Sequence, residues 1–279
     1  MMEKKFVLAG VMGWPVEQSR SPVIHNYWIK KHQLNGVYGK FAVKPGSVKD
    51  AIRGMPALGI AGSNVTAPHK VEAMQLMDYL DPIAKKMGAI NCIVVQPDGS
   101  LHGFNNDGFG YIQSLRDVKP NWRADEGPIT IIGSGGVSRA LLVSLIEEGA
   151  QEIRLFNRSR DKADALADEF GGPIKVYNWD ERHDAVSDVA LLVNATNQGM
   201  YNQPELDLRL DQLPKNALVS DTIYIPLETP FLKQARERGN LTVNGLGMLL
   251  NQAIPAFKAW FGVTPEITDE LRAEIAKTF

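Results

Sequence analysis

The stretch that most constrains the fold is ITIIGSGGVSRA, from Ile129 to Ala140. It begins with a short apolar run typical of a buried strand, continues through a glycine turn, and opens a helix that reads on as LLVSLIEEG. In such a unit the backbone approaches a pyrophosphate closely, and the N–H groups at the helix start favour its negative charge. We interpret the stretch as a nucleotide cradle; a purely structural glycine turn is the alternative.

The glycine pattern departs at one position from the G-x-G-x-x-G fingerprint of dinucleotide-binding turns. Gly133 and Gly135 match the first two positions, whereas Ser138 stands where the third glycine is expected. A small serine still lets the helix pack closely on the strand, so the interpretation holds.

The tip of the following strand, EIRLF, indicates which dinucleotide is bound. NAD-binding units carry a carboxylate about 20 residues after the glycine turn, where it bonds the ribose 2′-hydroxyl. This chain instead has Asn157-Arg158-Ser159-Arg160. Guanidinium groups bind phosphate bidentately, so the tip favours the 2′-phosphate of NADP over NAD. The alternative is a solvated basic turn in which Ser159 caps the next helix.

Composition excludes several classes of protein. The 279 residues suggest about two domains, with a net charge of −2 and no basic block that would favour nucleic acid or an anionic membrane. One cysteine, Cys92, rules out an intrachain disulfide, and no Cys/His cluster has zinc spacing. The first 15 residues resemble a signal peptide only faintly, and no apolar run reaches the ~18 residues of a membrane span. We therefore expect a cytoplasmic protein.

The order of the predicted elements indicates an α/β fold with two domains. Strands are expected at 6–12, 38–43, 60–66, 91–96 and 100–105, and helices at 48–58 and 71–80. After the polar connection 119–127, strands and helices alternate, which predicts a parallel sheet with right-handed crossovers. The strands of this part are expected at 129–132, 153–156, 189–193, 218–221 and 241–243, and the helices at 138–148, 162–170 and 229–238. A strongly apolar helix, 248–260, and an amphipathic helix, 265–276, end the chain and need a surface to cover. We therefore predict a first domain of residues 1–107 plus 244–279, with a mixed, mostly parallel sheet, and a Rossmann-like second domain of 108–243.

Four groups of polar residues lie near the ends of the predicted strands of the first domain. They are Ser19 with Ser21, Asn64 with Thr66 and Lys70, Asn91, and Asn105-Asn106-Asp107. Ligands of open α/β sheets bind beyond the carboxyl ends of strands, and these groups suit a polyhydroxylated, anionic small molecule. Taken singly, each has a structural explanation, such as a helix cap at Ser21 or Asp107.

Taken together, the motifs resemble one family. The chain contains, in order, SRSP-x-IHN, NVT-x-PHK, GAIN, NND, GSGGVSRA, NRS, NAT-x-x-GM, Y-x-P-x-x-TP and GMLLNQA-x-x-AF-x-x-W-x-G. This series, spanning about Val7 to Gly262, is similar to the shikimate dehydrogenase family. The resemblance implies a substrate domain, an NADP domain, and the reversible reduction of 3-dehydroshikimate to shikimate in aromatic amino-acid and chorismate biosynthesis.

The resemblance also implies roles for matching residues. Ser19 and Ser21, helped by Tyr224, would hold the substrate carboxylate. Its hydroxyls would contact Thr66, Asn91, Asp107 and Gln252, and Lys70 with Asp107 would form the catalytic pair. On the NADP side, the residues implied are Gly133, Gly135, Gly136, Ser138 and Arg139 at the pyrophosphate, Asn157, Arg158, Ser159 and Arg160 at the adenosine phosphate, and Asn194, Thr196, Gly245 and Met248 at the nicotinamide. The partners expected are small molecules only, with a monomeric or homodimeric chain.

Three departures from the family pattern bear on the substrate. Asn106 stands where the family usually has Thr, Asn197 where it has Ser, and the glycine turn reads GSGGV instead of GAGGA. Asn106 lies beside the expected catalytic aspartate, so shikimate, quinate and an amino-analogue all stay open as substrates. A non-catalytic ligand or redox sensor on the same frame is a second hypothesis, although it would not need Lys70 and Asp107 together. A methyltransferase is a third, and the arginines at 158 and 160 disfavour it, because a ribose diol suits an acidic residue.

Overall fold

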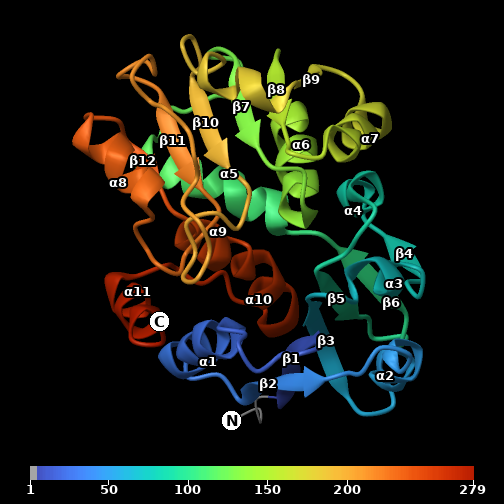
Figure 1. Cartoon of the computed structure of the whole chain (residues 1–279). Coiled ribbons are helices and arrows are strands. Elements are labelled where there is room, and N and C mark those ends of the chain that lie inside the picture. The colour runs from blue at the N-terminus through green and yellow to red at the C-terminus, as the bar shows by residue number, and fades with distance from the viewer. Residues whose placement is uncertain (1–4) are drawn as a thin grey trace. The chain divides into compact units, whose positions relative to one another are not determined.

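The computed structural model describes residues 5–279 and forms two compact α/β units (Figure 1). Unit 1 comprises Met1–Asn106 and Gln252–Phe279, and unit 2 comprises Asp107–Asn251. The α/β class, the two-domain organisation and the return of the C-terminal helices to the first unit were all predicted, and they are confirmed. Among the described residues, no helix is both long and apolar enough to cross a bilayer.

Unit 1 contains a six-stranded mixed sheet in the order β2-β1-β3-β5-β6-β4. Three of its five strand pairings are parallel, and β5 runs antiparallel to both of its neighbours. The strands are β1 (Val7–Gly13), β2 (Gly36–Ala42), β3 (Ile60–Val65), β4 (Tyr79–Leu80), β5 (Cys92–Val95) and β6 (Leu101–Phe104). The helices are α1 (Ser21–Lys31), α2 (Val48–Gly54), α3 (Lys70–Met74), α4 (Pro82–Met87), α10 (Ala253–Phe261) and α11 (Asp269–Ala276).

The C-terminal helices α10 and α11 complete the core of unit 1. In Figure 1 they lie against α1, near the start of the chain. The indole N–H of Trp260 donates to the carbonyl of Ile93 at 3.0 Å, and that of Trp28 donates to the carbonyl of Glu266 at 3.0 Å. Both indoles are almost completely buried. The apolar tail therefore covers the first sheet, as its need for a surface predicted.

Unit 2 contains a six-stranded, entirely parallel sheet in the order β12-β11-β10-β7-β8-β9. From β7 the chain moves outward through β8 and β9, then crosses to β10, β11 and β12, which is the doubly wound Rossmann order. The strands are β7 (Ile129–Ile132), β8 (Ile153–Phe156), β9 (Ile174–Tyr177), β10 (Leu191–Asn194), β11 (Leu218–Asp221) and β12 (Thr242–Val243). The helices are α5 (Asp107–Val118), α6 (Gly136–Glu147), α7 (Arg160–Phe170), the 3-10 helix η1 (Trp179–His183), α8 (Pro230–Glu237) and α9 (Gly245–Asn251).

The second boundary between the units falls after Asn251, whereas the sequence placed it at residue 244. The reason is the packing of α9 on α5. A Cβ at Gly247 would lie 2.8 Å from the Cβ of Ser114, and the Asn251 side-chain amide donates to the Asp117 carboxylate at 2.9 Å. These close contacts make α9 part of unit 2.

Four local predictions were wrong. Arg20, not Ser21, is at the N-cap position of α1, so the Ser21 hydroxyl does not cap it. The helix expected at 71–80 ends at Met74, and Tyr79–Leu80 forms β4 instead. The apolar tail helix is two helices, α9 and α10, which meet at Gln252. Strand β9 was not predicted, because Ile174 and Val176 are its only aliphatic residues.

We predict that Gly62→Ala destabilises unit 1. A Cβ at Gly62 would lie 1.9 Å from the Trp260 Nε1 and 2.3 Å from the Ile93 carbonyl oxygen. Overpacking of this kind costs about 1–3 kcal/mol, which urea unfolding followed by tryptophan fluorescence measures.

The matched control is Gly39→Ala, on β2 of the same sheet. A Cβ at Gly39 meets nothing within 4 Å. Its stability should be unchanged or raised by about 0.4–1 kcal/mol, through the lower entropy of the unfolded chain. Equal loss in both variants would contradict the role of the Trp260 contact.

Candidate functional site

The glycine turn of unit 2 leaves open space where a phosphate group would lie. Gly133 has φ +113°, and a Cβ there would lie 2.8 Å from the Ala195 carbonyl oxygen, so only glycine fits. Side chains at Gly135 and Gly136 would meet no protein atom within 4 Å. The Ser134 hydroxyl is buried and has no hydrogen-bond partner among the described residues. The first turn of α6, with no side-chain cap, adds N–H groups that have no partner within the helix.

A cleft of about 290 Å³ lies at this turn. Its walls come from the segments that follow β7, β8, β9 and β10, so it opens at the carboxyl ends of four parallel strands. The chain reverses its winding direction between β7 and β10, and open α/β sheets bind ligands at such a switch point. The lining residues are Gly133, Ser134, Gly135, Asn157, Arg158, Trp179, Ala195, Thr196, Asn197 and Gln198.

The two arginines predicted to read the adenosine phosphate differ in their contacts. Arg160 is engaged, since its guanidinium bonds the Asp164 carboxylate at 3.3 Å and the Asn178 side-chain oxygen at 2.6 Å. Arg158 lines the cleft, is exposed, and has no hydrogen-bond or ion-pair partner among residues 5–279. The Asn157 side chain donates to the Ser159 carbonyl at 2.9 Å and shapes the tip. Arg158 is therefore the residue best placed to receive a phosphate.

Two other predicted cofactor residues make bonds within the protein. The Ser138 hydroxyl is fully buried and donates to the Gly133 carbonyl at 2.8 Å, so it connects the first turn of α6 to the start of the glycine turn. Arg139 forms an ion pair with Glu169 on α7, with one N–O distance of 2.8 Å, and lies over the Phe170 ring. We expect both side chains to act on a cofactor indirectly, through the shape of the turn and the position of α7.

The loop after β10 is held by the side chain of Asn194, which is fully buried. Its oxygen accepts from the Thr196 N–H at 3.0 Å and from the Thr196 hydroxyl at 2.7 Å. Its amide donates to the Gln198 carbonyl at 3.0 Å and to the Asp221 carboxylate at 3.2 Å. Asn194 therefore shapes this wall of the cleft from behind.

The remaining predicted residues of unit 2 lie around α9. A Cβ at Gly245 would lie 2.1 Å from the Thr222 carbonyl oxygen, so the start of α9 requires glycine. Met248 is half-buried against the core of the unit. Tyr224 is also half-buried, in the segment that follows β11.

In unit 1 a chain of buried polar groups joins several predicted substrate residues. The Tyr38 hydroxyl donates to the Asn64 side-chain oxygen at 2.6 Å, and the Asn64 amide donates to the Asn91 carbonyl at 3.1 Å. The Asn91 amide in turn donates to the Gln252 side-chain oxygen at 3.4 Å. Burial raises the pKa of Tyr38, and a hydrogen bond with Ser21 opposes the rise. The structure thus brings Asn64, Asn91 and Gln252 into one network.

The other predicted residues of unit 1 lie on adjoining loops. The Ser21 N–H donates to the Ser19 hydroxyl at 3.4 Å, and Arg20 between them bonds the Thr278 carbonyl at 2.6 Å. Thr66 follows β3, and its N–H donates to the Met12 carbonyl at 2.9 Å. Lys70 begins α3, and its carbonyl accepts from the N–H of Ile90, next to Asn91. Its pairing with Asp107, the first residue of unit 2, stays a prediction.

The backbone N–H of Asn106 donates to the Asn91 side-chain oxygen at 2.8 Å, within unit 1. Burial raises the pKa of the Cys92 thiol to about 12, and the Asn106 side chain opposes that rise. Cys92 is thus a buried cysteine with no disulfide partner.

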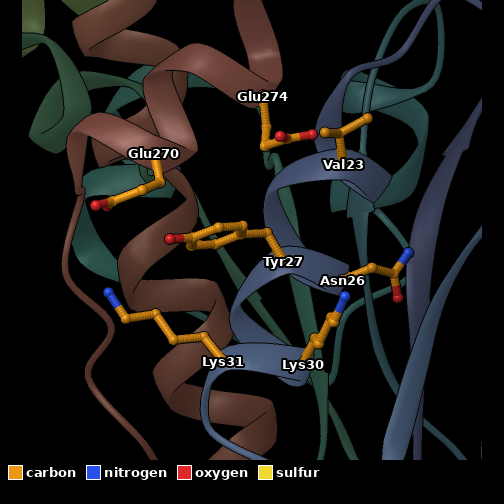
Figure 2. A pocket seen from close by; sticks show the side chains of 7 residues that line it. All are labelled: Val23, Asn26, Tyr27, Lys30, Lys31, Glu270 and Glu274. Atoms are coloured by element: carbon orange, nitrogen blue, oxygen red, sulfur yellow. The ribbon is translucent and has the colours of Figure 1, made fainter.

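A second hollow, of about 650 Å³, lies between α1 and α11 of unit 1. Figure 2 shows its lining side chains, which carry two lysines and two glutamates. Tyr27 bonds the Thr268 hydroxyl at 2.9 Å, and both ends of the Asn26 amide bond the backbone of Tyr38. These groups join α1 to α11 and β2, and none belongs to the predicted site.

Sequence reasoning missed several residues of both networks. In unit 2 these are Trp179 and Gln198 in the cleft wall and Asp221 behind it; in unit 1 it is Tyr38. Trp179 follows β9, a strand that was not predicted, so no sequence pattern placed Trp179 at the cleft. The pair Ser220-Asp221 at the end of a predicted strand was the one available signal for Asp221, since a carboxylate at such a position faces the ligand edge.

The residues of the cleft fit NADP. Open space at Gly135 and Gly136 admits a pyrophosphate, the unpartnered Ser134 hydroxyl offers a donor, and Arg158 offers an unpaired cation for a further phosphate. Among the described residues, no group of His, Cys, Asp and Glu side chains could hold a metal ion.

Known proteins resemble this chain over its whole length. Family models match residues 11–93 as a shikimate dehydrogenase substrate binding domain, 118–205 as shikimate / quinate 5-dehydrogenase, and 245–272 as a shikimate 5′-dehydrogenase C-terminal domain. A shikimate dehydrogenase (NADP(+)) from Paramagnetospirillum magneticum is 48% identical to this chain. The alignment covers 98% of this chain and 99% of the length of that relative.

Solved structures agree in fold. A crystal structure of a shikimate dehydrogenase in complex with NADP+ is 38% identical, with a TM-score of 0.88 over 100% of this chain and 98% of that chain. A quinate dehydrogenase from Corynebacterium glutamicum in complex with NAD has a TM-score of 0.90 but is 27% identical, over 98% of this chain and 100% of that one. With a full-length relative at this identity and three matching domain models, the chain belongs to the shikimate dehydrogenase family.

Proposed function

We propose that this chain is an NADP-dependent dehydrogenase that reversibly reduces 3-dehydroshikimate to shikimate. The observation that carries the proposal is the cleft of unit 2, in which Arg158 is unpaired beside an open glycine turn. The 48% identical relative is named for this activity and this cofactor. The fold alone does not distinguish between shikimate and quinate or between NADP and NAD, because the quinate dehydrogenase solved with NAD has an equally similar backbone.

The polar network of unit 1 forms the substrate side of the proposal. Ser19 and Ser21, with Tyr224, would hold the carboxylate, and Thr66, Asn91, Asp107 and Gln252 would contact the hydroxyls. Two observations support this assignment. Asn91 and Gln252 are hydrogen-bonded to one another, and Asn64, near Thr66, is bonded to both Asn91 and Tyr38. Such a network fixes the side-chain rotamers, so little entropy is lost when a polyol binds.

The proposed mechanism assigns proton transfer to Lys70 and orientation to Asp107. NADPH held at the glycine turn and Arg158 would supply the hydride that reduces the carbonyl carbon of the substrate. The Lys70 ammonium donates a proton to the carbonyl oxygen, and in the reverse direction its amine accepts the hydroxyl proton. Asp107 acts by orienting Lys70 and the reacting hydroxyl. Chemical rescue of Lys70→Ala and of Asp107→Ala distinguishes which of the two groups carries the proton.

The similarity to curated relatives supports shikimate as the substrate, because the 48% identical relative is named a shikimate dehydrogenase. The decisive experiment supplies shikimate, quinate and aminoshikimate with NADP or NAD and follows absorbance of the reduced nicotinamide. We expect shikimate with NADP to give the highest kcat/KM. Preference for quinate would make the chain a paralogue, and binding without any turnover would favour a sensor.

We also propose that the enzyme acts in the cytoplasm, as a monomer or homodimer. Its one cysteine, Cys92, is buried and unpaired, which suits a reducing compartment. Sedimentation velocity across a range of concentrations distinguishes the two assembly states.

We predict that Lys70→Ala lowers kcat by about 10²–10⁴-fold, because a positioned general acid contributes that much. The KM for shikimate should change far less. Steady-state assays in both directions give these constants, and added methylamine should restore part of the rate if the lysine itself transfers the proton.

The control for this variant is Lys49→Ala, which removes an exposed lysine of α2. It should keep the full rate. A Lys70→Ala enzyme with an unchanged kcat would remove Lys70 from the mechanism, and rescue of Asp107→Ala by acetate instead would transfer the proton role to Asp107.

We predict that Arg158→Ala raises the KM for NADP by about 10–100-fold. A charge-assisted hydrogen bond contributes about 1.5–3 kcal/mol, and each 1.4 kcal/mol is a factor of ten. The KM for NAD should stay near its original value, because NAD lacks the 2′-phosphate that Arg158 would bind.

Arg160→Ala is the matched control, since Arg160 is already paired with Asp164 and Asn178. Its NADP-to-NAD preference should change much less. If both variants lose the preference equally, the phosphate is shared between the two arginines, and the assignment to Arg158 alone is wrong.

A further inference from the structure

Asp221 is a buried carboxylate that the proposed mechanism does not use. It is the last residue of β11 and is 1% exposed. It lies behind the cleft and is not part of its lining. A charged group is buried at considerable cost unless hydrogen bonds compensate for the loss of water. The burial of the Asp221 carboxylate at this point of the fold therefore indicates a functional role for this residue.

Three donors from three different segments converge on this carboxylate. One oxygen accepts from the Ile223 N–H at 3.0 Å. The other accepts from the Thr229 hydroxyl at 2.7 Å and from the Asn194 amide at 3.2 Å. Thr229 is the N-cap of α8, and Asn194 ends β10. Asp221 thus joins the start of α8 to the neighbouring strand.

The bond to Asn194 is the one that reaches the cleft. The other three hydrogen bonds of Asn194 go to Thr196 and Gln198, and residues 195–198 line the cleft. An Asn side chain that rotates freely could not hold these partners together. The carboxylate fixes which end of the amide faces Thr196, because only the NH2 end can donate to Asp221.

We propose that Asp221 is a positioning residue for the NADP site, which holds the 195–198 wall in shape through Asn194. The inference rests on the proposed function, since it takes NADP as the occupant of the cleft. Asp221 lies outside the cleft lining; it acts through one hydrogen bond to Asn194, and that bond is strongest when the carboxylate is ionised.

The arrangement makes cofactor affinity depend on pH. Burial raises the pKa of Asp221 to about 6, against the three hydrogen bonds that lower it. Below that pH the added proton occupies an oxygen that faces donors, and the Asn194 bond is weakened. The charged residues of α8, which packs on β11, are Lys233, Arg236 and Glu237, and all three are exposed. β10 and β12 present only neutral side chains, and Tyr224 is the nearest titratable residue along the chain.

The test is equilibrium binding of NADP by isothermal titration calorimetry, for the wild type and for Asp221→Asn, from pH 5 to 8. At pH 8 the variant should bind about tenfold more weakly, the expected loss for a hydrogen bond to a charged group. Wild-type affinity should fall below pH 6 toward that of the variant. The 2′-phosphate also titrates near pH 6, but it does so with both proteins, so their ratio isolates Asp221; NAD, which lacks that phosphate, gives a second check.

Asn194→Ser cuts the same connection without altering the carboxylate, and keeps the inference testable if Asp221→Asn folds poorly. It should weaken NADP binding to a similar extent, and the double variant should add little, because both changes break one bond. kcat at saturating NADP should change much less than KM in each variant. Additive losses, or a pH-independent ratio of wild-type to variant affinity, would overturn the inference. A wild type that binds neither NADP nor NAD would overturn the proposed function instead.

Discussion

The close approach of two backbones at the switch point of unit 2 is the constraint on which the candidate site depends. The turn after β7 and the loop after β10 meet where Gly133 lies against the Ala195 carbonyl. Only a glycine with positive φ permits this approach, and the contact sets the distance between the phosphate turn and the opposite wall. The Ser138 hydroxyl below the turn and the Asn194 side chain behind the wall then fix both sides. Two residues that do not line the cleft, Ser138 and Asn194, therefore hold its two sides in shape.

The two units use buried polar groups in the same way. In unit 1 a tyrosine and three amides form a chain from β2 to the start of α10, and in unit 2 one aspartate and one asparagine connect two strands and a helix. A fully satisfied buried network holds one geometry, whereas an incomplete one would destabilise the fold. The network of unit 2 lies at the carboxyl ends of β10 and β11, the edge at which open α/β sheets bind ligands. Rigidity is thus concentrated beside the groups that would bind ligands.

The sequence predicted the elements whose patterns are local and missed what depends on tertiary contacts. Strands β7, β8 and β11 were placed correctly because short apolar runs between turn residues specify them directly. The prediction placed β4 at the end of a helix, because a strand of only two residues is too short to show an alternating pattern. Its pairing with β6 is a tertiary contact. The division of the apolar tail at Gln252 follows from the packing of α9 on α5, which no pattern within the tail reveals. At the candidate site, the motifs predicted both Arg158 and Arg160 without distinguishing them, because the difference lies in the partners of Arg160, Asp164 and Asn178. Asp221 and Tyr38 were missed for the same reason.

The discontinuity of unit 1 has a consequence for synthesis of the chain. Unit 2 is one continuous segment, Asp107–Asn251, and all the strands of its sheet are synthesised before α10 and α11. Unit 1 must wait for α10 and α11, because Trp260 and the backbone of Glu266 complete its core. Domains generally fold as units during synthesis. The nucleotide-binding unit therefore has its complete sequence first, although it comes second in the chain, and the sheet of unit 1 stays partly uncovered until α10 and α11 are made.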